Sequence, residues 1–446
     1  MASLTYMELL RGNRPFRCLL AGQVVSELGN WFNVIAVLGL VRAVTGASPE
    51  ATAWILVLRL APFALLAPVA GALADRWSRR AAMIWADLAR AVLALGFLFV
   101  GSAEDLWIAY ACMVALTMLS ALFEGAKNGA LPNVAGERGL LAGNALMFSS
   151  RFLLMAVGSA LGGLASAQFG YAVAFVVNAL SFAVSAYTVW LIPEEKTRAS
   201  EGGAARDADG RGPLSVWGDM REGWKYVAGH RLVAALIGVN ILWAVGGGAL
   251  GLVYERLGSV VFAGQGGFEG DAGVAFVHAA VGVGLFLGML LARRVGTHVE
   301  LRGRVASLIG WGIVAHGVLF ALAGLMPTLW LAALIMLLSR VVIGVEFAVQ
   351  DTLLLRLLPD HLRGRVVTTD RAAEIGVTSL TGIAAGWLLA GPLTPRSLTV
   401  LSGLLSAAPG LLWLLLFAAK KLTLPPRPRG EEEKRDAEAA ALASAG

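Results

Sequence analysis

The sequence predicts an all-α membrane protein with twelve transmembrane helices in two bundles of six. Three observations lead to this fold class. Hydrophobic residues make up 57% and charged residues 15% of the 446 residues, with a mean hydropathy of +0.72, which is too apolar for a soluble protein of this length. Apolar runs near the roughly 20 residues that cross a bilayer recur along the chain. They are continuous rather than alternating, which excludes barrel strands.

The apolar runs place the spans at residues 17–44, 50–73, 80–101, 105–127, 142–167, 171–191, 232–256, 273–294, 303–325, 328–350, 371–391 and 396–419. The loops on the side of the termini hold most of the arginine, whereas the opposite loops hold essentially Arg42, Arg256 and Arg396. The positive-inside rule therefore predicts that both termini lie in the cytoplasm. The expected location of this multi-pass protein is a bacterial-type inner membrane. The formal charge of +6 follows from loops that face anionic lipid and needs no nucleic-acid partner.

A long polar stretch divides the chain into two halves. Residues 1–192 are expected to form an N-terminal six-helix bundle and residues 232–420 a C-terminal one. The cytoplasmic linker 193–231 places Trp224 and Val227 at helical spacing among charges. An amphipathic helix there would lie on the membrane surface or dock on the protein's own loops. Residues 421–446, proline-rich and then charged, are typical of a disordered cytoplasmic tail.

The loop between the second and third spans reads GALADRWSRR. Arginines are typical of any cytoplasmic loop, but the positive-inside rule does not explain an aspartate beside an arginine or a glycine four residues earlier. The loop fits the pattern G-x-x-x-D-R-x-x-R-R/K at Gly71, Asp75, Arg76, Arg79 and Arg80. With this motif in this place, the sequence resembles the major facilitator superfamily.

Further stretches spread the resemblance over most of the chain. They are VVSELGNWFNVIAVLGLV in span one, LRLAPFALLAPVAGALADR in span two and LPDHLRGRV between spans ten and eleven. They are similar to the branch that holds macrolide-efflux proteins, the enterobactin exporter and lysophospholipid transporters, which moves chemically diverse molecules. In span five, Ser159 stands where the Gly-Pro-x-x-Gly-Gly signature of proton antiporters has proline.

The resemblance also implies a cytoplasmic gate that is shut in the outward-facing state. Asp75 is expected against the start of span eleven, whose helix N-terminus carries the positive end of a dipole. The loop arginines are expected to pair with Glu124 or with lipid phosphates. The implied gate residues are Gly71, Asp75, Arg76, Arg79, Arg80, Glu124, Asp370 and Arg371.

Two opposite charges inside spans are candidates for proton coupling, because a charge near the bilayer centre costs at least about 2.5–3.5 kcal/mol. Glu27 and Arg59 each lie about ten residues into their span, roughly 15 Å deep at a rise of about 1.5 Å per residue. Either Glu27 loads and releases a proton as a cationic partner comes and goes, or Glu27 and Arg59 form a permanent structural pair.

Other embedded side chains are candidates for the lining of an amphiphile-accepting cavity. Trp31 and Trp243 lie deep in the first helix of each half, and Arg151 and Arg340 would meet an anionic substrate group or a carboxylate on another helix. The full set is Asn30, Trp31, Asn33, Arg151, Asn178, Asn240, Trp243 and Arg340. By contrast, Asp87 and Arg90, three apart on one helix, are expected to pair with each other, and His278 and His316 are expected as core histidines.

Enzymatic function has little support in the sequence. There is no G-x-x-x-x-G-K-[ST], H-E-x-x-H or C-x-x-C pattern, so neither a cofactor, a metal nor direct ATP-driven transport is expected. The resemblance implies an exporter of an amphiphilic small molecule (a drug, a macrolide or a siderophore-like compound) that works by alternating access and draws on a proton gradient. It is expected to be monomeric. Its partners would be this substrate and membrane lipids. Two alternatives stay open: a lysophospholipid or lipid-type transporter without strict proton coupling, and a non-transporting membrane receptor or scaffold.

Overall fold

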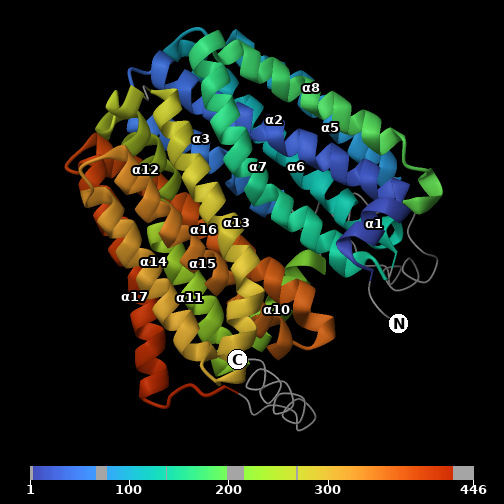
Figure 1. Cartoon of the computed structure of the whole chain (residues 1–446), viewed down its shortest axis with the longest axis vertical. Coiled ribbons are helices and arrows are strands. Elements are labelled where there is room, and N and C mark those ends of the chain that lie inside the picture. The colour runs from blue at the N-terminus through green and yellow to red at the C-terminus, as the bar shows by residue number, and fades with distance from the viewer. Residues whose placement is uncertain (1–3, 67–77, 137, 198–214, 268–269, 425–446) are drawn as a thin grey trace.

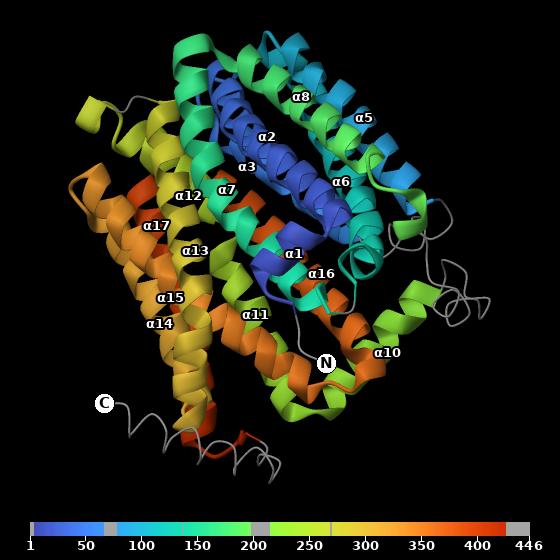
Figure 2. The ribbon, with the colours of Figure 1, turned by 45° about the vertical axis from the view of Figure 1, so that its right-hand side comes forward.

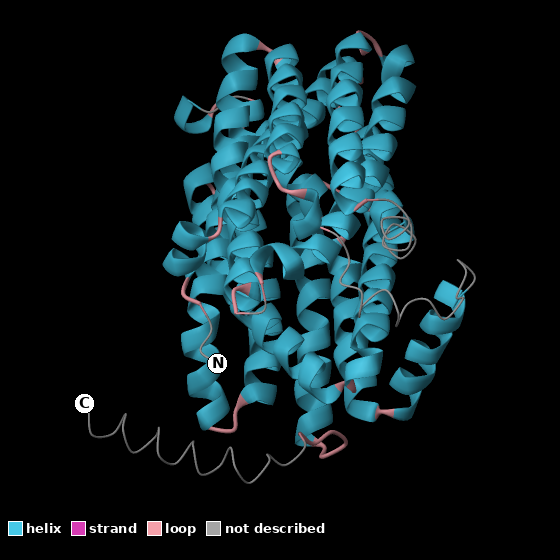
Figure 3. Ribbon diagram, turned by 90° about the vertical axis from the view of Figure 1, so that its right-hand side faces the viewer, coloured by secondary structure: helices cyan, strands magenta, loops and turns pink. Residues whose placement is uncertain are grey.

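The computed structural model describes residues 4–66, 78–136, 138–197, 215–267 and 270–424. All regular secondary structure in these ranges is helical (Figure 3). Twelve helical segments of the described chain are long and apolar enough to cross a membrane, and each overlaps one predicted span. The predicted all-α fold with twelve spans is therefore confirmed. Gly71, Asp75 and Arg76 of the predicted gate, and the predicted tail from residue 425 on, lie outside the described residues.

The helices follow one another as two sets of six spans (Figure 1). The first set is α2 (Arg14–Val44), α3 (Pro49–Leu58), α5 (Arg79–Gly96), α6 (Leu106–Ala135), α7 (Leu140–Phe169) and α8 (Tyr171–Trp190). The second set is α11 (Arg231–Gly247) with α12 (Leu250–Arg256), then α13 (Asp271–Leu301), α14 (Val305–Leu325), α15 (Leu329–Leu357), α16 (Asp360–Ala390) and α17 (Pro395–Ala418). The shorter helices α1 (Tyr6–Gly12) and α10 (Ser215–Gly229) lie outside the spans. The division of the chain into two bundles by a linker at residues 193–231 stays a prediction.

Local chemistry sets where the helices begin and end. The side chain of Asn13 caps α2, since its Oδ1 accepts a hydrogen bond from the backbone N–H of Phe16 at 2.9 Å. A proline sets the end of α15. Leu358 has an extended backbone before Pro359, because a proline disfavours the helical region for the residue before it. The helix therefore runs to Leu357 rather than to the predicted limit at residue 350.

Helix α10 in the linker docks on the protein itself. It packs against α16 and α11, with Val227 buried among the apolar residues of the second half. The Tyr226 hydroxyl donates to the backbone carbonyl of Leu357 at 3.4 Å, and the Tyr226 ring stacks on that of His230 with 3.8 Å between centroids. Of the two placements that the sequence allowed, the structure shows docking on the protein.

The two halves touch at one end of the molecule and diverge toward the other. Figures 1 and 2 both show α7 and α13 side by side at one end and apart at the end that carries α1 and α10. We call the latter the terminus end and the former the far end. At the contact, a Cβ on Gly282 of α13 would lie 2.6 Å from the backbone nitrogen of Ala156 on α7, so the two helices meet at backbone distance.

The buried apolar clusters reflect the same divergence. At the far end, the cluster of the first half takes in Val274 and Ala275 of α13, and the cluster of the second half takes in Ala53 of α3. The two clusters near the terminus end are each built, as far as the described residues go, from one half alone. The far end is thus one shared core, whereas the terminus end is two separate ones.

Candidate functional site

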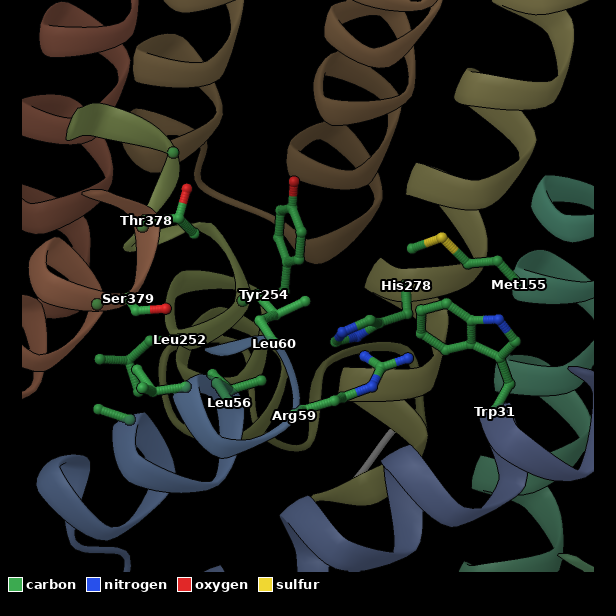
Figure 4. Close-up of a pocket in the computed structure, with 16 residues that line it drawn as sticks. Trp31, Leu56, Arg59, Leu60, Met155, Leu252, Tyr254, His278, Thr378 and Ser379 are labelled. Atoms are coloured by element: carbon green, nitrogen blue, oxygen red, sulfur yellow. The ribbon is translucent and has the colours of Figure 1, made fainter. Parts of the chain in front are cut away.

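A cavity of about 170 Å³ lies where the two halves meet (Figure 4). Sixteen residues line it, and they come from both halves. Most are aliphatic or glycine, and those with a polar side-chain atom are Trp31, Arg59, Tyr254, His278, Thr378 and Ser379. None of these sixteen lining residues is an aspartate or a glutamate. The cavity is therefore amphiphilic, with an apolar wall and one permanently charged group.

Arg59 lies at an interruption of α3. Pro62 has no backbone N–H for the carbonyl of Leu58, and the helix breaks after Leu58 and resumes at Ala61. The hydroxyl of Thr117 on α6 lies 3.2 Å from the carbonyl oxygen of Leu58 and 3.4 Å from that of Arg59. It also lies 2.8 Å from the carbonyl oxygen of Met113 on its own helix, so these three acceptors share its one hydrogen. The break thereby holds the Arg59 side chain in the cavity, where it points toward Trp31 and His278 (Figure 4).

The second half contributes an interruption of its own. Helix α11 ends at Gly247, and Gly248 lies in the turn before α12. A Cβ on Gly248 would lie 2.0 Å from Oγ1 of Thr381 and 2.5 Å from the carbonyl oxygen of Thr378, so only glycine lets α16 come this close. Broken helices within a membrane are tolerated where they line a cavity, and they are frequent at ligand sites there.

Aromatic rings connect the two halves across the cavity. The Arg59 guanidinium lies over the Trp31 ring, 4.8 Å from its centroid. The Trp31 ring is 6.1 Å from that of His278, which meets Tyr254 edge-on at 5.4 Å. Nδ1 of His278 is 2.9 Å from the carbonyl oxygen of Val274, so Nδ1 carries the hydrogen and donates it. The sequence analysis singled out Trp31 and Arg59 but missed Tyr254. Tyr254 lies in α12, a few residues after the run of glycines that interrupts the helix, and this position could have drawn attention to it.

A second arginine lies behind this wall. Arg340 of α15 is 4% exposed, and its Nη2 donates to the hydroxyl oxygen of Tyr254. Its guanidinium also lies over the rings of Tyr254 and Phe320, at 5.5 and 5.6 Å. Arg340 was predicted to meet a substrate or a carboxylate, and the structure gives it a phenol and two aromatic faces.

An ion-pair network closes the far end. Arg42, at the end of α2, pairs with Glu255 of α12 at 3.1 Å and also with Asp271 at the start of α13. Glu255 is fully buried, and it also pairs with Arg256 at 3.0 Å and accepts from Ser259 at 2.8 Å. We call Arg42, Glu255, Arg256 and Asp271 the Arg42 network. The sequence analysis treated Arg42 and Arg256 only as loop charges. Opposite charges at span ends on one side of the membrane could have predicted these ion pairs.

A family model described as the Major Facilitator Superfamily matches residues 19–371. The chain belongs to the Major Facilitator Superfamily. A segment of 191 residues is 31% identical to an uncharacterized MFS-type transporter, YfiS, of Bacillus subtilis (strain 168). This match covers 42% of the chain and spans 44% of the length of that relative.

Solved transporters share the fold of this facilitator. A POT family transporter in complex with a thioalcohol-conjugated peptide superimposes with a TM-score of 0.71 at 11% identity, over 91% of this chain and 96% of that one. A mutant form of the nucleoside transporter NupG gives a TM-score of 0.70 at 12% identity, over 90% and 100% of the two chains. At these identities the likeness shows the fold alone. The predicted superfamily is confirmed, while the efflux and siderophore-exporter branch stays a prediction.

The partner of Glu27 in the facilitator is Arg151 rather than Arg59. Nε of Arg151 on α7 donates to Oε1 of Glu27 at 2.9 Å, with the two side chains 49% and 14% exposed. The close packing of α2 on α7 explains the choice, because Gly158 of α7 lies directly against the backbone of α2. The Arg59 guanidinium instead lies over the Trp31 ring, although it stays within electrostatic range of Glu27 and Arg151. The predicted Glu27–Arg59 pair is therefore wrong.

The gate residues of the first half also have other partners than expected. Glu124 pairs with Lys127 one turn further along α6, at 2.7 Å, and Lys127 donates as well to Gln23 at 2.8 Å. Arg79 donates to the carbonyl oxygen of Gly129, and Arg80 to that of Trp190 at the end of α8. The predicted pairing of these loop arginines with Glu124 is not what the described residues show. The reason is that Lys127, three residues away on the same helix, lies on the same helix face and pairs with Glu124 instead.

One predicted gate residue of the second half, Asp370, forms a hydrogen bond with a predicted cavity residue, Asn240. Nδ2 of Asn240 donates to Oδ2 of Asp370 at 2.9 Å, and both side chains are buried. Arg371 pairs with Glu374 at 2.8 Å and with Asp351 at 3.1 Å. Asn240 is thus part of a polar cluster between α11 and α16 and is not among the residues that line the cavity. A role for Asp370 and Arg371 as gate residues stays a prediction.

Of the predicted cavity residues, Trp31 belongs to the described lining and the others do not. Asn33 and Asn178 are buried, with Asn178 against Gly29 in the contact of α2 with α8. Trp243 lies one layer behind the lining, against Gly247 and with its ring 5.2 Å from that of Phe347. The remaining residues of the set, Asn30, Arg151, Asn240 and Arg340, are likewise absent from the lining.

Proposed function

We propose that this facilitator is a secondary transporter that exports an amphiphilic small molecule by alternating access, in exchange for protons. The observation that carries the proposal is the cavity between the two halves, lined by aliphatic and aromatic side chains around one arginine. A wall of this composition suits a molecule with an apolar body and a polar group. At about 170 Å³ the cavity is smaller than the roughly 300–1,000 Å³ of sites that enclose a drug-sized ligand, so it holds part of the substrate.

The arrangement of the two halves supports alternating access. They share a core and the Arg42 network at the far end and diverge at the terminus end. With the basic loops in the cytoplasm, this is an inward-facing state. Access from the other side requires the ion pairs of Arg42 to break and the terminus ends to meet. Substrate and protons would bias this exchange by binding one state more tightly than the other.

Glu27 is the proposed coupling residue. Its side chain is 14% exposed, it lies on α2 within electrostatic range of Arg59, and it holds Arg151, whose side chain is 49% exposed. Because Arg151 is half-exposed, it is free to follow a conformational change and release Glu27. A carboxylate that loses its cation in a partly buried place takes up a proton, which is what coupling needs.

We expect Glu27→Gln to abolish substrate-triggered proton movement. Purified protein in liposomes that contain a pH-sensitive dye would be given a macrolide, a catecholate siderophore and a lysophospholipid in turn. In the wild type, one compound should move protons, and in Glu27→Gln this signal should fall to that of empty liposomes. Glu300→Gln is the matched control, since Glu300 forms an exposed pair with Arg356 at the surface.

Other outcomes redirect the proposal. Transport that survives Glu27→Gln without proton movement would make Glu27 structural, and if the transported compound is the lysophospholipid it would favour a lipid-type transporter. Lack of flux for every compound in the wild type would count against transport and for a receptor or scaffold.

A further inference from the structure

The cavity between the two halves has an excess of positive charge. Arg59 is the permanently charged residue of its lining, and the sixteen described lining residues include no carboxylate. The other titratable lining groups are the His278 ring and the Tyr254 phenol. Nothing in the lining therefore neutralises Arg59.

The Arg59 guanidinium also has its donors free. Within the described part of the chain, it forms no hydrogen bond or ion pair, and it lies over the face of the Trp31 ring, 4.8 Å from the centroid. A guanidinium has five N–H donors, and a ring face satisfies none of them fully. The nearby carboxylate of Glu27 is engaged by Arg151 at 2.9 Å, so Glu27, Arg151 and Arg59 together keep one positive charge.

Arg340 adds a second cation behind the cavity wall. Its guanidinium contacts the Tyr254 hydroxyl and the rings of Tyr254 and Phe320. The buried carboxyl group on the same helix, that of Glu346, lies against Gly312 of α14, a helix that contributes no residue to the described lining. Among the residues that the structure describes, these two arginines thus share the cavity region without a carboxylate in contact. A charge inside a membrane protein is costly to keep, and its usual justification is a partner or a ligand.

We propose that the substrate carries an anionic head group and that Arg59, beside the Trp31 ring, binds it. The inference rests on the proposed function and names its substrate class. A carboxylate, sulfonate, phosphate or catecholate presents oxygens that accept two parallel hydrogen bonds from a guanidinium. The apolar body lies against the apolar part of the lining, which includes Leu56, Leu60, Met155 and Leu252 (Figure 4).

The test compares two probes with one skeleton. 8-Anilinonaphthalene-1-sulfonate carries a negative charge, and N-phenyl-1-naphthylamine is the same ring system without it. Binding of each to the full-length protein in nanodiscs of zwitterionic lipid would be measured by equilibrium dialysis, with empty nanodiscs subtracted. We expect the sulfonate to bind on the order of 10- to 100-fold more tightly, as for a hydrogen bond to a charged group.

Variants assign this preference to Arg59. Arg59→Gln should bring the two dissociation constants within about twofold of each other. Arg59→Lys, which keeps the charge but loses the paired N–H donors, should retain only part of the preference. The surface control Arg356→Gln should leave it unchanged. Equal binding of the two probes by the wild type would overturn the proposal. So would an Arg59→Gln variant that still binds the neutral probe and keeps the full preference for the sulfonate. Where Arg59→Gln fails to fold, the wild-type ratio still tests the anionic head group, and a reduced ratio in Arg59→Lys assigns its binding to Arg59.

Displacement of the bound sulfonate separates the sources of the head group. Displacement by lysophosphatidylglycerol and not by 1-naphthoate assigns it to a lipid, and the reverse assigns it to a soluble acid. Equal displacement by the zwitterionic lysophosphatidylcholine and by lysophosphatidylglycerol contradicts a charge-selective site. The proton-flux assay is independent of these results: a transporter that moves protons but shows no charge preference keeps the proposed function and loses this inference.

Discussion

Replacing Arg42 with alanine is expected to open the far end of this facilitator. The change leaves Glu255, which is fully buried, and Asp271 without the cation that joins them to the first half. Removing one partner of a buried ion pair costs about 3–5 kcal/mol when the remaining charge stays buried and unpaired. Here that charge is Asp271, whose side chain is 10% exposed, because Glu255 keeps Arg256 at 3.0 Å. These contacts between the halves exist only while the far end is closed. The cost therefore falls on the closed state, and the population shifts toward the open one by a factor of roughly 100 or more.

Spin labels on the two halves would measure this shift. Ser102 and Ala263 are exposed near the far end, one in each half, and both would be replaced by cysteine in a variant that lacks Cys18 and Cys112. The label-to-label distance should lengthen in Arg42→Ala.

Arg396→Ala is the matched control for Arg42→Ala. Arg396 is also at the far end but donates to the carbonyl oxygens of Gly324 and Met326 within the second half. A control variant that lengthens the distance as much as Arg42→Ala would show that any arginine lost at this end loosens the structure. That result would contradict the specific role of the Arg42 network.

Arg90→Met is expected to lower the free energy of unfolding of the first half by about 3–5 kcal/mol. Arg90 pairs with Asp87 on α5, and the two residues are 3% and 0% exposed. Its guanidinium is enclosed between the rings of Phe123 and Phe182, each 4.5 Å away. Methionine would fill part of this space, but Asp87 would be left as an uncompensated charge in an apolar surrounding.

Thermal unfolding of the purified variants checks this prediction. The double variant Asp87→Asn with Arg90→Met should recover most of the lost stability, because it removes both charges together. If the double variant is as unstable as Arg90→Met, the loss comes from the aromatic contacts of Arg90 and not from the charge on Asp87. The pair itself was predicted from its spacing of three residues on one helix, and the structure confirms it.

Sequence reasoning succeeded where short range decides the outcome. The pairing of Asp87 with Arg90 and the helical linker segment 215–229 follow from spacing along one helix. It failed where the partner lies on another helix. Glu27 and Arg151 are 124 positions apart, and Arg42 is 213 positions from Glu255. Which of two distant charges meets a given side chain depends on how far each helix is rotated and shifted against its neighbour, and hydrophobic runs do not encode that.

The sequence by itself determined that this chain crosses a membrane twelve times as helices and belongs to the superfamily it resembles. The reason is that the bilayer requires about 20 apolar residues and a fully bonded backbone for each span, a demand that is local and readable. Only the tertiary structure decided that the Arg59 guanidinium lies over the Trp31 ring in a cavity whose described lining has no carboxylate, and that Arg42 joins the halves. Those facts depend on helix breaks at Pro62 and Gly248 and on contacts between halves that are far apart in sequence.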